Sequence, residues 1–364
     1  MTSPSISPAD HAHMAHALRL AEQGLYSTDP NPRVGCVIVR DGTVVGAGYH
    51  QRAGESHAEV YALRAAGERA RGADVYVTLE PCNHHGRTPP CSAALIAAGV
   101  ARVVIAAVDP HPKASGGIAV LRAAGIRVDS GVLAAQAEAQ NPGFFSRWRR
   151  ARPWVRSKLA MSLDGRTALA SGASQWITGA DARRDVQRWR ARSSAILTGS
   201  GTVLTDNPRL TVRAEELGEP VTRQPMRVVI DGQARTPHDA AILNRDARTL
   251  IVTAGARSAW PADVEHLECA GANGHVDLVK LMQELARRDV NEVLVEAGAR
   301  LNGALLEAGL IDECIIYIAP LLLGDSARGL FHLPQIATMQ DKRALDIIDV
   351  RAVGRDWRLL ARPK

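Results

Sequence analysis

The chain has 364 residues, of which 46% are hydrophobic, 23% charged and only 4% aromatic, with a formal net charge of +6. This length predicts about two domains, each large enough to bury its own core. No segment approaches the roughly 20 consecutive apolar residues that a membrane-spanning helix needs. Residues 1–25 also lack the continuous apolar segment of a secretory signal peptide, so a membrane or exported protein is not expected.

Five cysteines occur, and their odd number and irregular spacing argue against a disulfide framework and for a reducing compartment. We therefore expect a cytoplasmic protein. Much of the positive charge lies in one segment, RWRRAR at residues 147–152. No aromatic platform or RNA motif accompanies it, so a solvated linker is favoured over a nucleic-acid surface. A modest basic balance also suits a phosphorylated small substrate.

The first half of the chain alternates between helix and strand signals. Residues 10–24 predict an amphipathic helix beginning at Asp10, whose histidines are interpreted as a polar face because no cysteine or carboxylate is spaced with them. Residues 31–39 and 43–50 predict two strands joined by a turn at 41–42. This alternation predicts a sheet with helices on both faces. The further predicted elements are a helix near residue 57, a strand at 74–80, a helix from residue 91, a strand at 102–108, a helix at 117–124 and a strand at 126–132.

The stretch from His57 to Cys91 carries the ligands that zinc prefers. Catalytic zinc sites use three protein ligands and keep a fourth position for water, and His57, Cys82 and Cys91 would supply these three. Glu59 is then free for proton transfer. Zinc deaminases carry the pattern H-x-E followed by P-C-x-x-C. This chain has HAE and then Pro81-Cys82, although eight residues separate the two cysteines.

The spacing of these residues constrains the site. Side chains two apart on a helix point roughly 200° apart, so His57 and Glu59 converge only if the site lies end-on at a helix N-terminus. A helix start after Ser56 fits that placement. Cys91 likewise opens a helical stretch after a Pro-Pro pair, where the positive helix end favours a thiolate.

A closed structural zinc site is the alternative, with His84 or His85 as the fourth ligand. Such a site has no use for a spare carboxylate, so Glu59 favours the catalytic interpretation.

The alternating pattern restarts after residues 141–154, which predicts a domain boundary between residues 1–148 and 149–364. Thr178 or Asp181 is the expected cap of a helix at 180–193. Residues 164–178 and 213–225 are expected to be loops. The predicted strands are 154–162, 194–199, 226–232, 248–254, 291–298 and 313–320, and the other predicted helices lie near 276–288 and 300–308. This half is therefore a second α/β unit.

Two glycine-bearing turns of the second half suit phosphate. Residues 295–306 place a turn between a strand and a helix, so that backbone amides and the helix N-terminus face outward together. Residues 199–213 add a glycine pair, an aspartate and an arginine. Neither is a GxGxxG motif, and a plain chain connection is the alternative for both.

The loop PCNHHGRTPPC at 81–91 and the segment NPRVGCVIV at 31–39 resemble the deaminase half of the bifunctional riboflavin-biosynthesis deaminase/reductase family. The family's loop is close to P-C-[small]-H-x-G-[KR]-T-P-P-C, and only Asn83 differs mildly.

The resemblance implies that Asn31 touches the substrate and that His84 and Arg87 belong to the loop that closes over it. His111 departs from the family, because DPHP stands here where DPNP is usual.

Further motifs of the second half resemble the reductase half of the same family: SKLAMSLDGRTA, SGASQWIT, RRDVQRWR, TGSGTVLTDNPRLTVR, VVIDG and VEAG, in this order. Together the two halves cover nearly the whole chain. The implied fold class is α/β, with a cytidine-deaminase-like three-layer domain followed by a dihydrofolate-reductase-like domain. The implied cofactors are zinc and NADPH.

The resemblance also implies a reductase site. Trp176 as ordinary core and Arg190 as a solvated helix residue are the plainer alternatives, whereas Arg213 suits phosphate because a guanidinium binds it bidentately. Lys158 would be a polar contact at the reacting carbon. The substrate's ribose phosphate would be met by Ser174, Arg190, Leu210, Arg213 and Glu296. NADPH would be held by Ala160, Trp176, Thr202, Asp206, Gly232, Gly298, Ala299, Arg300, Leu301, Asn302, Gly303 and Ala304.

The expected function is therefore bifunctional. The first domain would deaminate a phosphorylated diaminopyrimidine, and the second would reduce its ribosyl group with NADPH. The expected partners are this small substrate, with no nucleic acid and no membrane, and the sequence leaves a homo-oligomer open. The alternatives are a nucleic-acid base deaminase fused to a binding module and a non-catalytic zinc-binding interaction protein.

Overall fold

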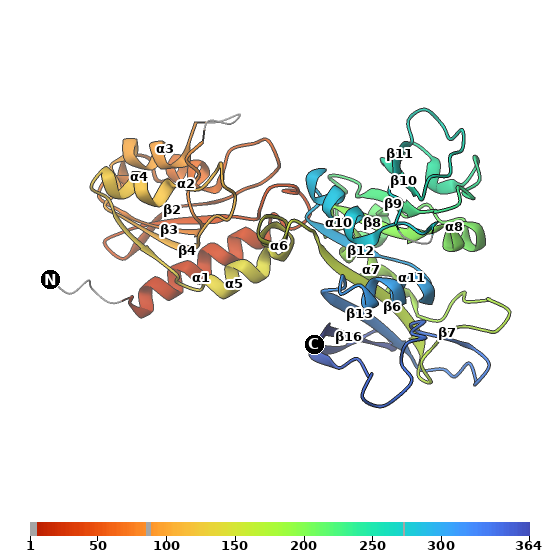
Figure 1. Cartoon of the computed structure of the whole chain (residues 1–364). Coiled ribbons are helices and arrows are strands. Elements are labelled where there is room, and N and C mark those ends of the chain that lie inside the picture. Colours follow the sequence, from red (N-terminus) through yellow and green to blue (C-terminus); the bar gives the residue numbers. More distant parts are fainter. Residues whose placement is uncertain (1–5, 85–88, 272–273) are drawn as a thin grey trace. The chain divides into compact units, whose positions relative to one another are not determined.

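The computed structural model describes residues 6–84, 89–271 and 274–364, and the chain divides into two compact units, Met1–Arg150 and Ala151–Lys364 (Figure 1). This division falls two residues after the boundary expected from the sequence. Among the described residues, no helix is both long and apolar enough to cross a membrane.

The first unit is built on a five-stranded sheet of order β2-β1-β3-β4-β5. Strand β1 is antiparallel to β2 and β3, whereas β3, β4 and β5 are parallel. Its elements are α1 (Pro8–Glu22), β1 (Gly35–Arg40), β2 (Thr43–Tyr49), α2 (Ala58–Ala66), the 3-10 helix η1 (Gly67–Ala70), β3 (Asp74–Leu79), α3 (Cys91–Ala98), β4 (Arg102–Ala107), α4 (Gly117–Ala123), β5 (Arg127–Ser130), α5 (Ala134–Gln140) and α6 (Pro142–Arg150).

Alternate side chains of β1 face two different layers of helices. Cys36 and Ile38 pack in one buried cluster with residues of α2, α3 and α4. Val37 and Val39 pack in another with residues of α1, α5 and α6. The sheet is therefore covered on both faces, which confirms the predicted three-layer arrangement.

Two glycines of β2 let helix α2 approach the sheet closely. A Cβ at Gly46 would lie 2.3 Å from the carbonyl oxygen of Ala62, and one at Gly48 would lie 2.5 Å from the Cβ of Tyr61. A larger side chain at either position would displace this helix, whose N-terminus carries His57.

Helix α1 begins at Pro8, whereas the sequence pattern predicted a start at Asp10. Ser7 is the N-cap: its hydroxyl accepts a hydrogen bond from the Asp10 N–H (3.1 Å), and the Asp10 carboxylate accepts one from the Ser7 N–H (2.8 Å). Asp10 is thus the third helical residue of a capping box, and not the cap itself.

The basic segment 147–152 is exposed at Arg149 and Arg150, as predicted, but it is not a linker. Residues 147–150 belong to helix α6. Arg149 makes hydrogen bonds of 2.6 and 2.7 Å with Glu138, and Arg152 makes two of 2.8 Å with Asp312. The pattern was misleading because these acidic partners lie on other elements of the chain.

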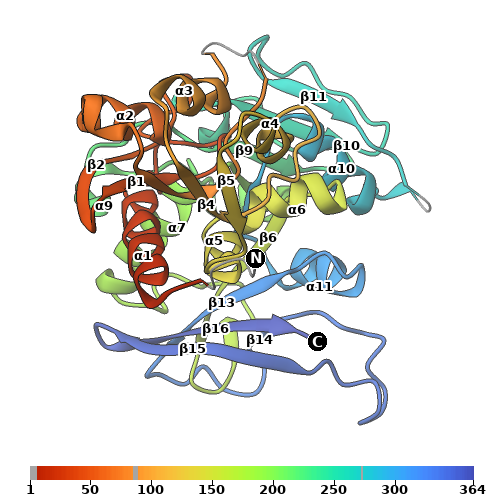
Figure 2. The same ribbon diagram turned by 90° about the vertical axis from the view of Figure 1, so that its left-hand side faces the viewer.

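The second unit holds a nine-stranded sheet of order β11-β10-β9-β8-β12-β6-β13-β16-β15. The strands from β11 to β13 run parallel, and β16 and β15 form an antiparallel hairpin at one edge (Figure 2). Strands β7 and β14 form a separate two-stranded ribbon. Its elements are β6 (Trp154–Ser162), β7 (Arg166–Ala168), α7 (Ala180–Arg192), β8 (Ala195–Gly199), α8 (Ser200–Asp206), α9 (Ala214–Leu217), β9 (Met226–Ile230), the 3-10 helix η2 (Ala241–Leu243), β10 (Thr249–Thr253), β11 (Glu265–Glu268), α10 (Leu278–Arg287), β12 (Glu292–Val295), α11 (Ala299–Glu307), β13 (Glu313–Ala319), β14 (Arg328–Gly329), β15 (Leu345–Val353) and β16 (Asp356–Pro363).

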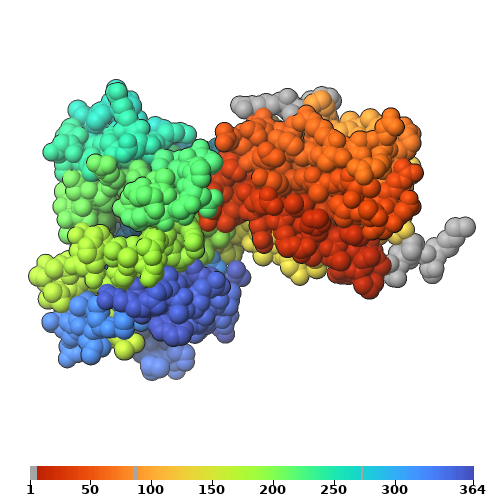
Figure 3. Space-filling model, turned by 180° about the vertical axis from the view of Figure 1, so that it is seen from behind, coloured from red at the N-terminus to blue at the C-terminus, as the bar shows by residue number. Residues whose placement is uncertain are grey.

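Helices cover both faces of this sheet as well. Leu281 of α10 and Leu305 of α11 belong to the large buried cluster on one face. On the other face, α7 packs through Val186 and Trp189 against Tyr317. Figure 3 shows the yellow-green surface that includes α7 between the green surface of the following elements and the blue surface of the C-terminal hairpin.

The cap predicted for α7 is wrong. The N-cap is Gly179, with no side-chain cap, and its N–H donates to Asp356 of the C-terminal hairpin (2.7 Å). A partner distant in sequence thus replaces the local cap that Thr178 or Asp181 was expected to give. The segments expected to be loops, 164–178 and 213–225, contain the short elements β7 and α9.

Candidate active sites

His57 and Glu59 lie at the N-terminus of α2, where the spacing placed them. His57 is the N-cap, with extended backbone (φ −77°, ψ 167°), and Glu59 lies in the first turn. Because the N-cap is outside the helical spiral, the two side chains can face the same site.

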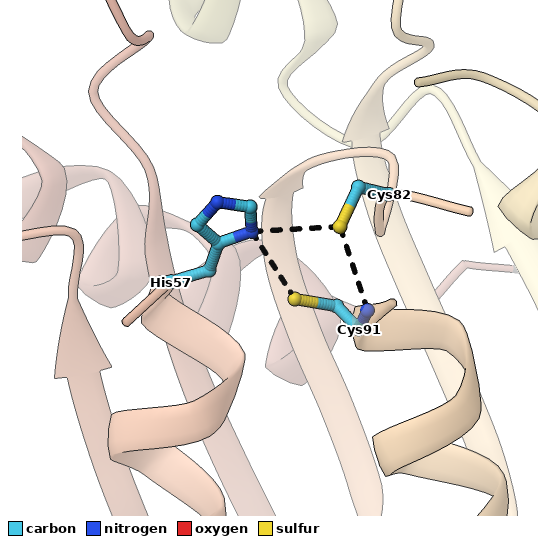
Figure 4. Close-up of side chains that lie close together, drawn as sticks. All are labelled: His57, Cys82 and Cys91. Carbon is cyan, nitrogen blue, oxygen red and sulfur yellow. Dashed lines mark hydrogen bonds between the residues drawn. The ribbon is translucent and has the colours of Figure 1, made fainter. Parts of the chain in front are cut away.

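Three metal-binding side chains converge there (Figure 4). His57 Nδ1 lies 3.5 Å from Cys82 Sγ and 3.3 Å from Cys91 Sγ, and the three ligand atoms lie within 4.8 Å of one another. Cys82 comes from the loop after β3, and Cys91 opens α3 and donates its backbone N–H to Cys82 Sγ (3.4 Å).

This donor set fits zinc. With Zn–N and Zn–S bonds of typical length, tetrahedral geometry separates a nitrogen and a sulfur ligand by about 3.6 Å, close to the distances seen here. Three protein donors leave the fourth position for a water or substrate. Among the described residues His84 is not part of the cluster, so it does not close a structural site, and His85 lies outside the described residues.

The cluster favours a thiolate even without the metal's charge. Hydrogen bonding from Cys91 and from His57, opposed by burial, lowers the pKa of Cys82 to about 4. The bond with Cys82 and burial together raise the pKa of Cys91. The bond to Cys82 also raises the pKa of His57. These directions favour a Cys82 thiolate beside a protonated His57, whose proton must leave when a cation binds.

Glu59 is 3% exposed. Burial raises the pKa of its carboxyl, and the nearby His57 opposes that shift. A carboxyl whose pKa is moved toward neutrality gives and takes protons more readily at physiological pH.

Around the zinc ligands, the structure adds residues that the sequence did not single out. Glu80 accepts hydrogen bonds from the N–H groups of Asp109, Gly116 and Ile118 (3.0 to 3.2 Å), which holds the loop after β4 beside Cys82. The only sequence signal was its place directly before Pro81-Cys82.

His84 and His111, both singled out from the sequence, lie together. Their rings are nearly parallel with centroids 6.4 Å apart, and the His111 ring lies 3.9 Å from the Trp148 ring. Ring contact with Trp148, at an interplanar angle of 34°, is thus a packing role for His111 that an asparagine could not fill. Arg87 lies outside the described residues.

The second site is marked by a half-buried ion pair at the carboxyl ends of the parallel strands. Glu296 follows β12, and its carboxylate accepts hydrogen bonds from Arg190 Nε (2.6 Å) and NH2 (2.8 Å). Arg190 also donates to the Thr211 carbonyl (2.9 Å). The alternative of a solvated Arg190 is therefore wrong, because its carboxylate partner lies far away in sequence.

Charges around this pair are coupled. Burial would raise the pKa of Glu296, but the Arg190 guanidinium lowers it. Lys158 on β6 is half-buried, and burial lowers the pKa of its ammonium group while Glu296 opposes that shift. Ligands of open α/β sheets bind outside the carboxyl ends of the strands, and these three side chains lie at that edge.

Arg213, by contrast, is exposed. Its guanidinium bonds Glu216 (2.8 Å), and its backbone N–H donates to Gln187 (3.1 Å). Leu210 is buried and Ser174 half-buried. Gln187 was missed from the sequence because its contacts join two elements, α7 and α9.

The residues proposed for NADPH follow the same sheet edge. Thr202 and Asp206 lie in α8 after β8, Gly232 follows β9, and Gly298 is the N-cap of α11 after β12. A Cβ added at Gly298 would meet no atom within 4 Å, so the space before the N-terminus of α11 is open. An open helix N-terminus fits a phosphate-bearing cofactor.

The other candidates for that cofactor range from exposed to fully buried. Trp176 is 68% exposed and contacts Arg183, so the alternative of an ordinary core residue is wrong. Ala160 is half-buried in β6. Within α11, Asn302 is buried and accepts a hydrogen bond from Ser157 (2.6 Å), and Gly303 packs against the chain at His332. Asn302 and Gly303 therefore support the turn from the protein interior, whereas Ala304 and Arg300 are exposed.

Comparison with known proteins finds a family match for each half of the chain. Residues 7–107 match the cytidine and deoxycytidylate deaminase zinc-binding region, and residues 153–359 match the RibD C-terminal domain. The riboflavin biosynthesis protein RibD of Escherichia coli is 53% identical over 357 residues, covering 95% of this chain and 97% of that protein. That of Haemophilus influenzae is 47% identical over 369 residues, covering 98% of both.

Solved structures give the same result. RibD of Acinetobacter baumannii (form 1) has a TM-score of 0.91 at 44% identity, covering 98% of this chain and 99% of that one. A diaminohydroxyphosphoribosylaminopyrimidine deaminase/5-amino-6-(5-phosphoribosylamino)uracil reductase from Thermotoga maritima has a TM-score of 0.88 at 32% identity, with the same coverage.

The fold and the two sites define the class: a zinc-dependent deaminase joined to a reductase. The chain belongs to the riboflavin biosynthesis protein RibD family. Zinc and NADPH are accordingly its cofactors. The match of the second half to a reductase domain contradicts the alternative in which that half only binds nucleic acid.

Proposed function

We propose that this chain catalyses two successive steps of riboflavin biosynthesis. Residues 1–148 would convert 2,5-diamino-6-(5-phosphoribosylamino)pyrimidin-4(3H)-one to 5-amino-6-(5-phosphoribosylamino)uracil. Residues 149–364 would then reduce the ribosyl group to the ribityl chain. The observation that carries this proposal is the convergence of His57, Cys82 and Cys91 beside the buried Glu59. The activities named for the Thermotoga maritima relative, which matches along nearly the whole chain, support it.

In the deaminase, bound zinc makes water acidic enough to attack at neutral pH. The protein's part is to hold and move protons. Glu59 takes the proton released when the new C–O bond forms and gives it to the amine that leaves as the C–N bond breaks, so that ammonia is released. Because Glu59 is buried, that proton is not lost to solvent water. Asn31 and the His84 loop would bind the pyrimidine.

In the reductase, NADPH supplies the hydride, and the protein's part is to orient the reactants. Arg190 and Glu296 already neutralise one another, so Glu296 suits the ribosyl hydroxyls, which donate hydrogen bonds, better than the phosphate. Arg213, with its exposed guanidinium, is the phosphate contact. Lys158, on the interior strand β6, would contact the reacting carbon's oxygen.

A time course by mass spectrometry tests the proposal. The purified, zinc-loaded protein is incubated with the diaminopyrimidine ribosyl phosphate, with and without NADPH. Deamination should occur without NADPH, and the ribityl product should form only after NADPH is added. If the zinc-loaded protein releases no ammonia, the deaminase assignment is wrong.

Replacing Arg213 with alanine should raise the reductase KM roughly tenfold and leave kcat nearly unchanged. A phosphate contact remote from the reacting carbon binds ground state and transition state alike. The matched control is Arg184→Ala, because Arg184 is also an exposed arginine that bonds an acid three residues away, Asp181. Steady-state kinetics on the deaminated substrate check this, and an unchanged KM in the Arg213 variant would remove that residue from the site.

Replacing Glu296 with glutamine should lower reductase kcat/KM and stability together. Arg190 and Lys158 would lose their nearby carboxylate, and a hydrogen bond to a charged group contributes about 1.5 to 3 kcal/mol. Urea denaturation, followed at the unfolding transition of the reductase unit, would measure the change in stability. Steady-state kinetics would measure the change in kcat/KM. Glu265→Gln is the control, since Glu265 pairs with Arg248 and Arg288 at the surface. A variant destabilised but fully active would make Glu296 a structural residue only.

We also propose that the protein works in the cytoplasm. Its five cysteines, Cys36, Cys82, Cys91, Cys269 and Cys314, are all free thiols, which suits a reducing compartment.

A further inference from the structure

His50 lies beside the zinc ligands and is buried, with both ring nitrogens in hydrogen bonds. Its Nδ1 is 3.0 Å from the carbonyl oxygen of Ser56, and its Nε2 is 3.1 Å from Nδ2 of Asn31. The His50 ring stands edge-on to the His57 ring, with centroids 5.4 Å apart. His50 therefore joins Asn31 to the start of the zinc-binding helix.

The Ser56 carbonyl decides which nitrogen of His50 carries the proton. A carbonyl oxygen can only accept a hydrogen bond, so Nδ1 must be the donor. In the neutral ring, Nε2 is then an acceptor. Its partner at 3.1 Å must donate, which assigns the NH₂ arm of the Asn31 amide to the side that faces His50.

The orientation of this amide decides what Asn31 offers to a ligand. Its NH₂ arm is engaged by His50, so the carbonyl oxygen Oδ1 is the arm that His50 does not hold. Within the described parts of the chain, Oδ1 has no hydrogen-bond partner, and Asn31 is half-buried beside His50, whose ring lies against that of the zinc ligand His57. The Oδ1 acceptor is thus free for a ligand, and of the two N–H donors of the amide His50 engages one.

We propose that His50 is a positioning residue that holds the Asn31 amide with its carbonyl oxygen toward the substrate, so that the deaminase site selects pyrimidines that present an N–H group there. The inference rests on the proposed deaminase function. A ligand with a nitrogen lone pair at the same place would face the oxygen lone pairs. The mismatch leaves a polar atom unpaired and costs on the order of tenfold to a hundredfold in affinity.

A double-mutant cycle tests whether His50 acts through Asn31. Asn31→Ala and His50→Phe should each lower deaminase kcat/KM by roughly tenfold or more. The double variant should be no worse than Asn31→Ala alone, because without the amide His50 has nothing to position. If the two effects multiply instead, His50 acts independently of Asn31 and the proposal is overturned.

Rescue separates positioning from simple packing. His50→Gln has an amide that can donate to the Ser56 carbonyl and accept from Asn31, so it should recover much of the activity lost in His50→Phe. Zinc content and reductase turnover of the same proteins show that each variant is folded. Equal losses in the Gln and Phe variants would contradict the hydrogen-bond role. Wild-type protein that does not deaminate would overturn the proposed function instead.

The tautomer can be measured without turnover. In ¹⁵N spectra of the full-length, zinc-loaded protein with labelled histidines, His50 should carry its proton on Nδ1. Its signals are assigned by their loss in His50→Phe. Protonation on Nε2 would reverse the Asn31 amide and overturn the proposal, whether or not the deaminase activity is confirmed.

Discussion

Glutamine in place of Glu59 is expected to keep the zinc content unchanged and to lower the kcat of deamination by roughly a hundredfold to ten-thousandfold. The amide has the size of the carboxyl but cannot accept a proton and return it. Glu59 is 3% exposed, and the zinc ligands of the described cluster are His57, Cys82 and Cys91. The substitution therefore removes proton transfer and leaves metal binding intact.

Ammonia release and metal content, measured on the same preparation, check this prediction. Glu55→Gln is a suitable control, because Glu55 is an exposed carboxylate two residues before His57, as Glu59 lies two residues after it, and its carboxylate accepts a hydrogen bond from Tyr61. Loss of zinc in Glu59→Gln would show a structural effect, and near-wild-type ammonia release would refute the proton-transfer role.

The zinc site could be predicted from sequence because its chemistry is carried by residue type and by local spacing. His57, Cys82 and Cys91 are ligands that zinc prefers, and a helix start at residue 57 is a local signal. The contributions of His50 and Glu80 were not predictable in the same way. Their hydrogen bonds join segments that only the folded sheet brings together, so no spacing in the sequence reports them.

The second unit shows the same division. Its buried parallel strands were predicted because they are continuous apolar runs. The hairpin β15–β16 was missed. Most residues of β15 are exposed, its apolar residues included, so the strand lacks the alternation of buried apolar and exposed polar residues that marks a half-buried strand. The pairing of Arg190 with Glu296 was also missed. An arginine on an arginine-rich helix has the same sequence pattern whether its partner is water or a carboxylate 106 residues away.

Replacing Cys91 with serine is expected to abolish zinc retention and deamination while leaving the reductase active. Serine removes one of the three donors, and without zinc the attacking water keeps a pKa near that of bulk water, about 15.7 instead of about 7. Deamination should fall at least a thousandfold, to the background rate. Reduction of the substrate that is already deaminated should stay within about twofold of wild type.

The expected independence has a structural basis. The first unit buries Cys36, Leu95 and Leu121 in its own cluster, and the second buries Val155, Leu197 and others in another. Each unit thus has its own core, so loss of zinc in one need not unfold the other. Metal analysis and two separate assays, one for each substrate, measure the outcome. Cys36→Ser is the matched control, because it removes a buried thiol of the same unit outside the zinc cluster. Persistent deamination in the Cys91 variant would move the active site elsewhere, whereas parallel loss of both activities would mean that the zinc cluster also stabilises the reductase.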